Sequence, residues 1–326
     1  MQEIITLATE NLLSPVILCF ILGLAAALGR SDLSIPEAAA KMLSIYLLFA
    51  IGFKGGVSVA GHGLDATLGA TLLTGVALSA LLPFLAFGLL RVLTRLDRMN
   101  AAAVAGHYGS ISIVTFLAGV NLLAQRGVDS EGYMVAVAAV MEAPAILSAL
   151  WLISRDGKSR LDATLFREIL LNGSIVLLVG AFFIGWITGQ QGMTRIEPFI
   201  GAPFQGVLCL FLLDMGLIAG RGLRRSWGAL GGGALAFGMV MPLLASAVGL
   251  GAASLLGLSL GGTVLLMILA ASASYIAVPA AMRVALPEAD PSIYLTLSLG
   301  VTFPFNIFVG IPIYLAIANT LHGVGG

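Results

Sequence analysis

Two short polar stretches decide how this chain is expected to fold: residues 106–112 (Gly-His-Tyr-Gly-Ser-Ile-Ser) and residues 271–275 (Ala-Ser-Ala-Ser-Tyr). Each lies in the middle of a long apolar segment, where a membrane helix normally carries Leu, Ile or Val. Ser110 and Ser274 are 164 positions apart, which is about half of the chain. Small and hydroxyl residues at matching places in two halves of a hydrophobic protein indicate broken helices at a transporter binding site.

The composition is that of an integral membrane protein made of spanning helices. Of the 326 residues, 59% are hydrophobic and 10% are charged, whereas a soluble domain carries about 25% charged residues. The net charge is zero and no nucleic-acid-binding motif is present, so no nucleic-acid partner is expected. Ten apolar segments are predicted as membrane helices, at residues 12–29, 37–60, 68–91, 101–124, 131–153, 171–189, 203–222, 229–257, 262–285 and 292–318.

The two halves of the chain resemble each other. Four pairs of residues share the offset of 164 positions: Gly52 and Gly216, Gly56 and Gly220, Ser110 and Ser274, and Glu142 and Asn306. Because each half holds five segments, an odd number, the second half enters the membrane from the opposite side, which predicts an inverted repeat. The predicted units are residues 1–153, a polar cytoplasmic linker at 154–168, and residues 169–326.

Lys and Arg predict the orientation of the chain in the membrane. With the amino terminus outside, twelve of the sixteen lie in cytoplasmic loops and helix ends, and two, Arg126 and Arg195, lie in outside loops. Lys41 and Lys54 lie within the second segment and are not counted. Because cytoplasmic loops carry the excess of positive charge, both termini are predicted to lie outside.

The directions of the fourth and ninth segments predict an anion site. If each segment breaks at its serine-rich centre, the second half-helices begin near residues 109–112 and 273–275, and their positive N-termini point to the membrane midplane. The hydroxyls of Ser110, Ser112, Ser272 and Ser274 add hydrogen-bond donors, and carbonyls at the ends of the first half-helices suit Na⁺. The alternative is that these small residues only allow close helix packing. Their presence in both halves favours a site.

Three polar residues are candidate sodium ligands. Glu142 lies near the middle of the fifth segment, where a carboxylate costs about 2.5–3.5 kcal/mol and is rarely without a partner. It is interpreted as a cation ligand or a tie between helices, and the alternative is a protonated structural residue. Thr302 and Asn306 are four positions apart in the tenth segment and offer a hydroxyl and an amide oxygen. An interhelical hydrogen bond is the alternative for this pair.

Three further polar residues lie within apolar segments. Asp214 and Lys54 occupy nearly corresponding places in the two halves, which suggests an ion pair or one shared cavity, although Lys54 can also extend to the membrane surface. His107 is interpreted as bonding to a neighbouring helix, with a proton sensor as the alternative. Motifs of hydrolases, metalloenzymes and phosphate-binding loops are absent from the sequence, so an enzyme is not expected.

Several long motifs resemble the sodium-dependent bicarbonate transporter family of the SbtA type. The resemblance runs from residues 35–38 (Ile-Pro-Glu-Ala) onward and is carried by residues 106–112, 131–134, 141–146, 211–217, 271–283, 285–289, 302–306 and 310–312. It implies ten helices in two inverted repeats of five, divided into a core and a gate domain. It also implies a homotrimer in the lipid of a bacterial inner membrane, with Na⁺-coupled bicarbonate uptake by an elevator-like movement of the core.

The resemblance also assigns site residues. Bicarbonate is expected at Gly109, Ser110, Ser112, Ala273, Ser274 and Tyr275, and sodium at Ser272, Glu142, Thr302 and Asn306. A PII-like regulatory protein on the cytoplasmic face is a further implied partner, although the linker 154–168 is shorter than in cyanobacterial members. The alternative functions are a Na⁺-coupled carrier of another small anion or carboxylate, a Na⁺/H⁺ exchanger using Glu142 and Asp214, and a membrane sensor or scaffold without transport.

Overall fold

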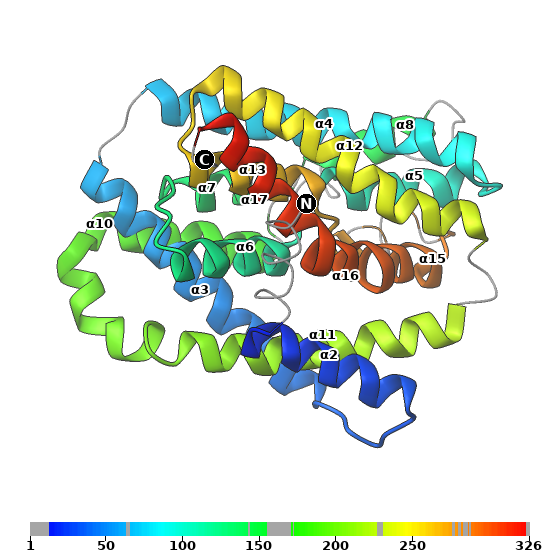
Figure 1. The fold of residues 1–326 in the computed structure, drawn as a ribbon, viewed down its shortest axis with the longest axis horizontal. Coiled ribbons are helices and arrows are strands. Elements are labelled where there is room, and N and C mark those ends of the chain that lie inside the picture. Colours follow the sequence, from blue (N-terminus) through cyan, green and yellow to red (C-terminus); the bar gives the residue numbers. More distant parts are fainter. Residues whose placement is uncertain are drawn as a thin grey trace.

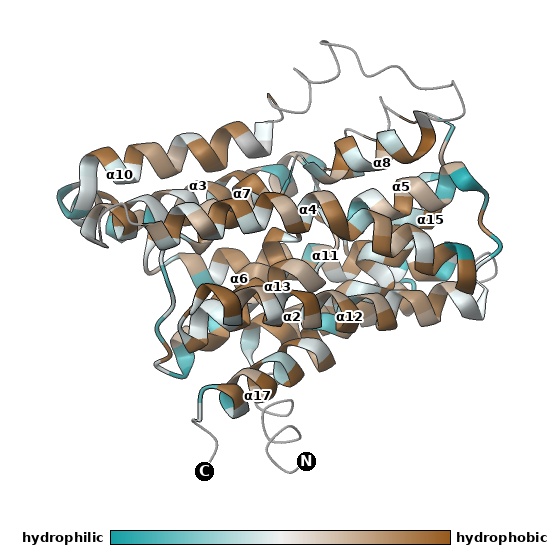
Figure 2. Ribbon diagram, turned by 90° about the horizontal axis from the view of Figure 1, so that it is seen from above, coloured by the Kyte–Doolittle hydropathy of each residue, from teal (hydrophilic) through white to brown (hydrophobic). Residues whose placement is uncertain are grey.

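The computed structural model describes residues 13–62, 66–142, 144–154, 171, 173–226, 231–275, 278–279, 282, 286 and 288–323. Within these residues every regular element is a helix, and eight stretches are long and apolar enough to cross a membrane. Two shorter apolar helices, Pro15–Leu28 and Leu260–Ala271, overlap the predicted first and ninth segments. The all-α membrane class is confirmed, and most residues of the helices are apolar (Figure 2).

Most helices of the described chain follow the predicted apolar segments closely. In chain order they are α2 (Pro15–Leu28), α3 (Glu37–His62), α4 (Ala66–Leu93), α5 (Arg98–Gly109), α6 (Ile113–Gln125), α7 (Met134–Val140), α8 (Pro144–Ser154), α10 (Gly173–Ile200), α11 (Phe204–Ser226), α12 (Gly232–Leu256), α13 (Leu260–Ala271) and α15 (Pro291–Leu295). The tenth segment continues as the π-helix η1 (Thr296–Thr302), α16 (Phe303–Phe305), the π-helix η2 (Asn306–Gly310) and α17 (Ile311–Leu321). The predicted linker 154–168 lies, apart from Ser154, outside the described residues.

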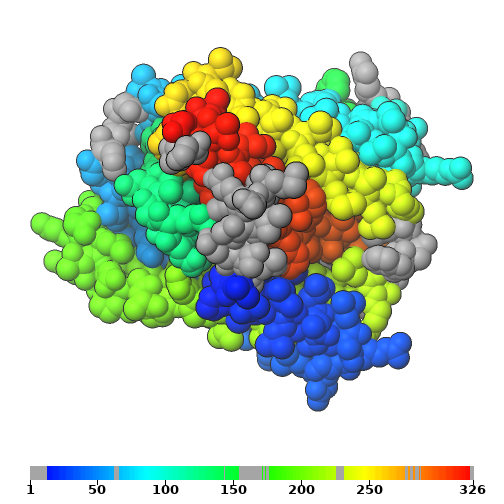
Figure 3. All heavy atoms as spheres, in the orientation of Figure 1, coloured from blue at the N-terminus to red at the C-terminus, as the bar shows by residue number. Residues whose placement is uncertain are grey.

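The helices form two groups. In one, α3 packs along α10, α2 packs along α11, and α11 also contacts α3 (Figure 1). In the space-filling view this group forms the lower edge of the molecule, with α2 in blue and α10 and α11 in green to yellow-green (Figure 3). The other group joins α4, α5 and α8 to α12, α13 and α17. The predicted breaks lie in this second group.

Glycines set the two long crossings of the first group. A Cβ at Gly56 would overlap the Phe182 carbonyl on α10, and a Cβ at Gly216 would overlap the Phe20 carbonyl on α2. A Cβ added at Gly52 or Gly220, one turn away on the same helices, would also come within 3 Å of the partner helix. Both pairs of glycines that share the offset of 164 therefore have the same function, which is to let two helix backbones touch.

The half-helices α5 and α13 match each other in length and in both caps. Each has 12 residues, begins after a polar N-cap, Asp97 or Ser259, and ends at an extended serine, Ser110 or Ser272. These caps are 162 positions apart, so Ser110 corresponds to Ser272, and not to Ser274 as expected. The helices α7 and η1 share the same offset, which places Glu142 opposite Pro304 instead of Asn306. The expected pairings are therefore shifted by two residues in this group.

Candidate functional site

The predicted break in the fourth segment is confirmed. Helix α5 ends at Gly109, the chain is extended at Ser110 and Ser112, and α6 begins at Ile113. Ser112 is the N-cap of α6, because its Oγ accepts hydrogen bonds from the Thr115 N–H at 3.2 Å and from the Thr115 hydroxyl at 2.9 Å. Gly109 allows the close approach of α4, since a Cβ there would overlap the ring of Pro83.

The ninth segment also leaves the helical conformation at its serine-rich centre. Helix α13 ends at Ala271, residues 272–275 are not helical, and the chain is helical again at Val278 and Pro279. Ser274 Oγ accepts a hydrogen bond from the Val278 N–H at 3.4 Å. Ser112 Oγ accepts a similar bond from the Thr115 N–H at the start of α6. Ala273, between the two serines, is buried.

Hydrogen bonds join the two breaks directly. The Ser274 N–H donates to the His107 carbonyl at 2.8 Å. The Ser112 N–H donates to Ser272 Oγ at 2.9 Å, and that hydroxyl donates to the Leu269 carbonyl at 3.0 Å. Two of the backbone N–H groups that the breaks expose inside the protein are thus paired across the two halves of the chain.

The candidate carboxylate lies in a third break, between α7 and α8. Glu142 is 7% exposed, and its Oε2 accepts a hydrogen bond from Ser110 Oγ at 3.0 Å. Ser79 on α4 holds the two sides of this break, donating to the Met141 carbonyl at 2.6 Å and accepting from the Ala145 N–H at 3.1 Å. Ser79 was not among the predicted residues. Its position four residues before Pro83 in an apolar helix was the one available signal.

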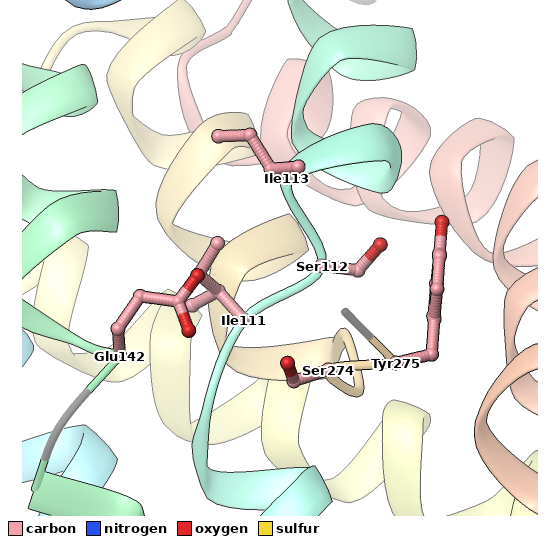
Figure 4. Close-up of a pocket in the computed structure, with 6 residues that line it drawn as sticks. All are labelled: Ile111, Ser112, Ile113, Glu142, Ser274 and Tyr275. Carbon is pink, nitrogen blue, oxygen red and sulfur yellow. The ribbon is translucent and has the colours of Figure 1, made fainter. Parts of the chain in front are cut away.

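A small cavity lies where the three breaks meet. It is lined by Ile111, Ser112, Ile113, Glu142, Ser274 and Tyr275, and Glu142 enters it from the side opposite Ser112 and Tyr275 (Figure 4). Its volume of about 10 Å³ corresponds to about one water molecule. The Tyr275 hydroxyl is buried and lies near Ser112, but it makes no hydrogen bond of good geometry in the described part of the chain. A buried donor without such a bond is unusual and is available to a bound molecule.

Thr302 and Asn306 do not line this cavity. Thr302 Oγ1 donates to the Gly238 carbonyl on α12 at 2.6 Å and lies 2.6 Å from the Tyr108 hydroxyl. Asn306 donates from Nδ2 to the Ala271 carbonyl at 2.9 Å, and its Oδ1 accepts from the Tyr314 hydroxyl at 2.8 Å. The interhelical hydrogen bonds expected as the alternative for this pair are confirmed.

Lys54 and Asp214 do not form the ion pair suggested by their positions. Lys54 Nζ lies 4.7 Å from the centroid of the Phe204 ring, in the first turn of α11. Asp214 is buried ten residues further along that helix, about 15 Å away at the rise of an α-helix. The two charged groups are therefore too far apart to interact directly.

His107 bonds within its own helix instead of to a neighbouring one. Its Nδ1 lies 2.7 Å from the Ala103 carbonyl, one turn earlier on α5, and its ring stacks on Tyr294 with 4.4 Å between centroids. The ring is fully buried and Nε2 has no hydrogen-bond partner among the described residues. His107 thus supports the end of α5, while its backbone carbonyl accepts from Ser274.

A comparison with protein families identifies the chain. A model described as the Na⁺-dependent bicarbonate transporter superfamily matches residues 15–319. The chain belongs to this superfamily. A search of curated proteins finds no match. The family match includes both serine-rich breaks and Glu142, and membership implies a sodium-dependent bicarbonate transporter, not an enzyme.

Proposed function

We propose that the chain is a Na⁺/bicarbonate symporter that works by elevator-type alternating access. The observation that carries this proposal is the cavity between the helix breaks, where a buried carboxylate faces hydroxyl groups and the start of a helix. In such a low-dielectric interior, a bound cation lowers the free-energy cost of burying an anion, and a bound anion does the same for a cation. One site of this kind therefore favours binding of both ions together.

The two ions take different sides of the proposed site. Bicarbonate binds at the positive N-terminus of α6, near Gly109 and Ser112. The opposite wall of this half of the site consists of Ser274, Tyr275 and the backbone at Ala273. The Tyr275 hydroxyl supports this assignment, because it lies near Ser112 without a hydrogen bond of good geometry and can donate one to the anion. Sodium binds beside the Glu142 carboxylate and Ser110. Ser272, Thr302 and Asn306 support the site through the hydrogen bonds that they make to the helices around it.

The proposed architecture is an inverted repeat of five plus five helices. The glycine crossings of α3 with α10 and of α2 with α11 support it, as do the equal lengths and caps of α5 and α13. In this proposal the group of α2, α3, α10 and α11 is the gate domain, which also forms a homotrimer. The second group is the core that moves with its ions. Both termini lie outside a bacterial inner membrane.

The small size of the cavity indicates that the core must move for bicarbonate to bind. Bicarbonate has four non-hydrogen atoms, whereas the cavity of about 10 Å³ holds about one water molecule. The anion therefore enters only when the walls of the cavity separate. Loading from one side and release on the other then requires two open conformations, as alternating access demands.

The proposal is tested by uptake of labelled bicarbonate into proteoliposomes with and without an inward sodium gradient. Uptake driven by the gradient supports symport. Sodium-driven uptake of another carboxylate in place of bicarbonate identifies a different small anion. A sodium-driven pH change without bicarbonate identifies a Na⁺/H⁺ exchanger, and absence of all three favours a membrane sensor or scaffold.

Glu142→Gln is expected to raise the sodium concentration for half-maximal uptake about tenfold, which is about 1.4 kcal/mol. Gln keeps the volume and one oxygen but removes the charge that faces Na⁺. Without sodium, the Glu142 carboxylate repels an anion in the same cavity, so sodium should load before bicarbonate. The control is Glu288→Gln, which changes an exposed carboxylate. A sodium titration of Glu142→Gln that overlaid the wild type would make Glu142 a protonated structural residue.

Bicarbonate and sodium are also expected to bind cooperatively at equilibrium. Thermodynamic linkage requires that each ion increase the binding affinity for the other by the same factor. Calorimetric or thermal-shift titrations of bicarbonate, at increasing sodium and constant ionic strength, should show a falling dissociation constant. A dissociation constant that did not change with sodium would count against symport.

A further inference from the structure

Ser79 satisfies two backbone groups that the break at Glu142 would otherwise leave unpaired. The Met141 carbonyl follows the end of α7, and the Ala145 N–H is the first one of α8, because Pro144 has none. A single buried hydroxyl, Ser79 Oγ, donates to the first at 2.6 Å and accepts from the second at 3.1 Å. Glu142 lies between these two attachment points, so Ser79 holds both sides of the segment that carries the carboxylate.

The neighbourhood of Ser79 touches the fourth-segment break as well. Pro83 has no N–H to offer the Ser79 carbonyl one turn earlier. A Cβ at Gly109 would lie 2.8 Å from that carbonyl oxygen. Residues 79–83 of α4 therefore contact the end of α5 on one side and the break at Glu142 on the other. The Ser110 hydroxyl and the Glu142 carboxylate, which meet at 3.0 Å, come from the two segments that this part of α4 holds.

The second half of the chain makes a related bond without a carboxylate. Gly238 lies four residues before Pro242 on α12, as Ser79 lies four residues before Pro83 on α4. There the hydroxyl comes from the tenth segment, since Thr302 donates to the Gly238 carbonyl at 2.6 Å. Both bonds join a proline-interrupted helix to a neighbouring segment, but only the Ser79 hydroxyl also binds the N–H of a residue near a carboxylate.

We propose that Ser79 is a positioning residue for sodium, fixing the Glu142 carboxylate opposite Ser110. This inference rests on the proposed function of Glu142. Without the hydroxyl, the Met141 carbonyl and the Ala145 N–H lose a shared partner and the break shifts. A displacement of this kind changes the geometry of a ligand more than the stability of the helices around it. Loss of the Ser79 hydroxyl should therefore weaken sodium binding more than it weakens bicarbonate binding.

The chain offers a matched control in Ser148. Its hydroxyl donates to the Ala80 carbonyl at 2.8 Å and joins the same two helices, α8 and α4, one turn after the break. It makes no bond to the break itself. Ser148→Ala removes a hydroxyl between these helices while leaving the attachment of Glu142 intact.

The experiment is a sodium titration of bicarbonate uptake in proteoliposomes for the wild type, Ser79→Ala, Ser79→Thr and Ser148→Ala. Ser79→Ala should raise the half-saturating sodium concentration about fivefold or more and leave the KM for bicarbonate at saturating sodium within about twofold. Ser79→Thr, which keeps the hydroxyl, should restore the sodium response, and Ser148→Ala should match the wild type. The thermal shift produced by sodium in detergent should shrink in Ser79→Ala alone.

The outcomes separate this inference from the proposed function. A wild type whose uptake ignores sodium overturns both. A sodium-dependent wild type with an unchanged half-saturation in Ser79→Ala overturns only the role of Ser79. Equal shifts in Ser79→Ala and Ser148→Ala overturn it too, because they would reflect general packing of α4 on α8. If Ser79→Ala fails to insert, Ser79→Cys is titrated in its place under the same criteria.

Discussion

Ser110→Leu and Ser274→Leu are each expected to abolish sodium-dependent bicarbonate uptake. Both serines are buried, at 1% and 2% exposure, and Ser274 lines a cavity of about 10 Å³ that has no room for a larger side chain. Leu at either position also removes a hydroxyl, and at Ser110 this is the donor to Glu142. The loss should be complete because the added side chain occupies the space that the ions need.

Uptake per folded protein is the quantity to measure, because a leucine forced into a packed interior costs about 1–3 kcal/mol of stability. Size-exclusion profiles and thermal melting report how much of each variant remains folded. Ser254→Leu is the control, since Ser254 is exposed on α12 and should transport normally. Wild-type uptake by both Ser110→Leu and Ser274→Leu would show that the ions do not bind in this cavity.

Gly56→Ala is expected to prevent the protein from folding stably. The added Cβ would overlap the Phe182 carbonyl and lie 2.6 Å from the Trp186 nitrogen, both in the backbone of α10. Backbone atoms of a helix cannot rotate away as a side chain can, so α3 and α10 must separate along their crossing. The expected loss is about 3 kcal/mol or more of the free energy of unfolding, at the upper end of overpacking costs.

Gly61→Ala is the matched variant for this prediction. It adds the same methyl group to the same helix, α3, where the added Cβ would meet no other part of the described structure within 4 Å. Alanine should leave stability unchanged or raise it by up to about 1 kcal/mol through its helix propensity. The comparison is the melting temperature and the yield of monodisperse protein. Equal values for the two variants would show that the crossing of α3 with α10 tolerates a side chain.

Apolar length and small residues were sufficient to predict most of the helices and the break at residues 110–112, but not the break at Glu142. Both signals are local, because a membrane helix needs a long apolar run and a break needs residues that tolerate it. The glycines also suggested the proposed repeat, but the half-helices follow an offset of 162 and the glycines one of 164. A single offset across the chain therefore misaligned Ser110 with Ser274.

The roles of the other polar residues depend on contacts that no local pattern reveals. Asn306 has the chemistry of a sodium ligand, but Ala271 and Tyr314 already occupy its amide. Ser79 resembles any hydroxyl in an apolar helix until Met141, 62 residues later, is brought against it. Sequence reasoning identified which residues were able to bind an ion. The packing of distant helices decides which of them face the cavity.

The hydrogen bonds between the two breaks differ in the two halves, and this difference concerns how transport compares at the two membrane faces. Ser274 reaches the His107 carbonyl directly, whereas Ser112 reaches the Leu269 carbonyl through the Ser272 hydroxyl. In an inverted repeat with identical halves, exchanging their conformations would convert the outward-open state into the inward-open one at no cost in free energy. In the proposed alternating-access mechanism, halves of different sequence remove that degeneracy, and we expect the apparent affinities at the two membrane faces to differ. They leave the direction of net flux to the ion gradients, and a reversed sodium gradient should drive bicarbonate out through the same protein.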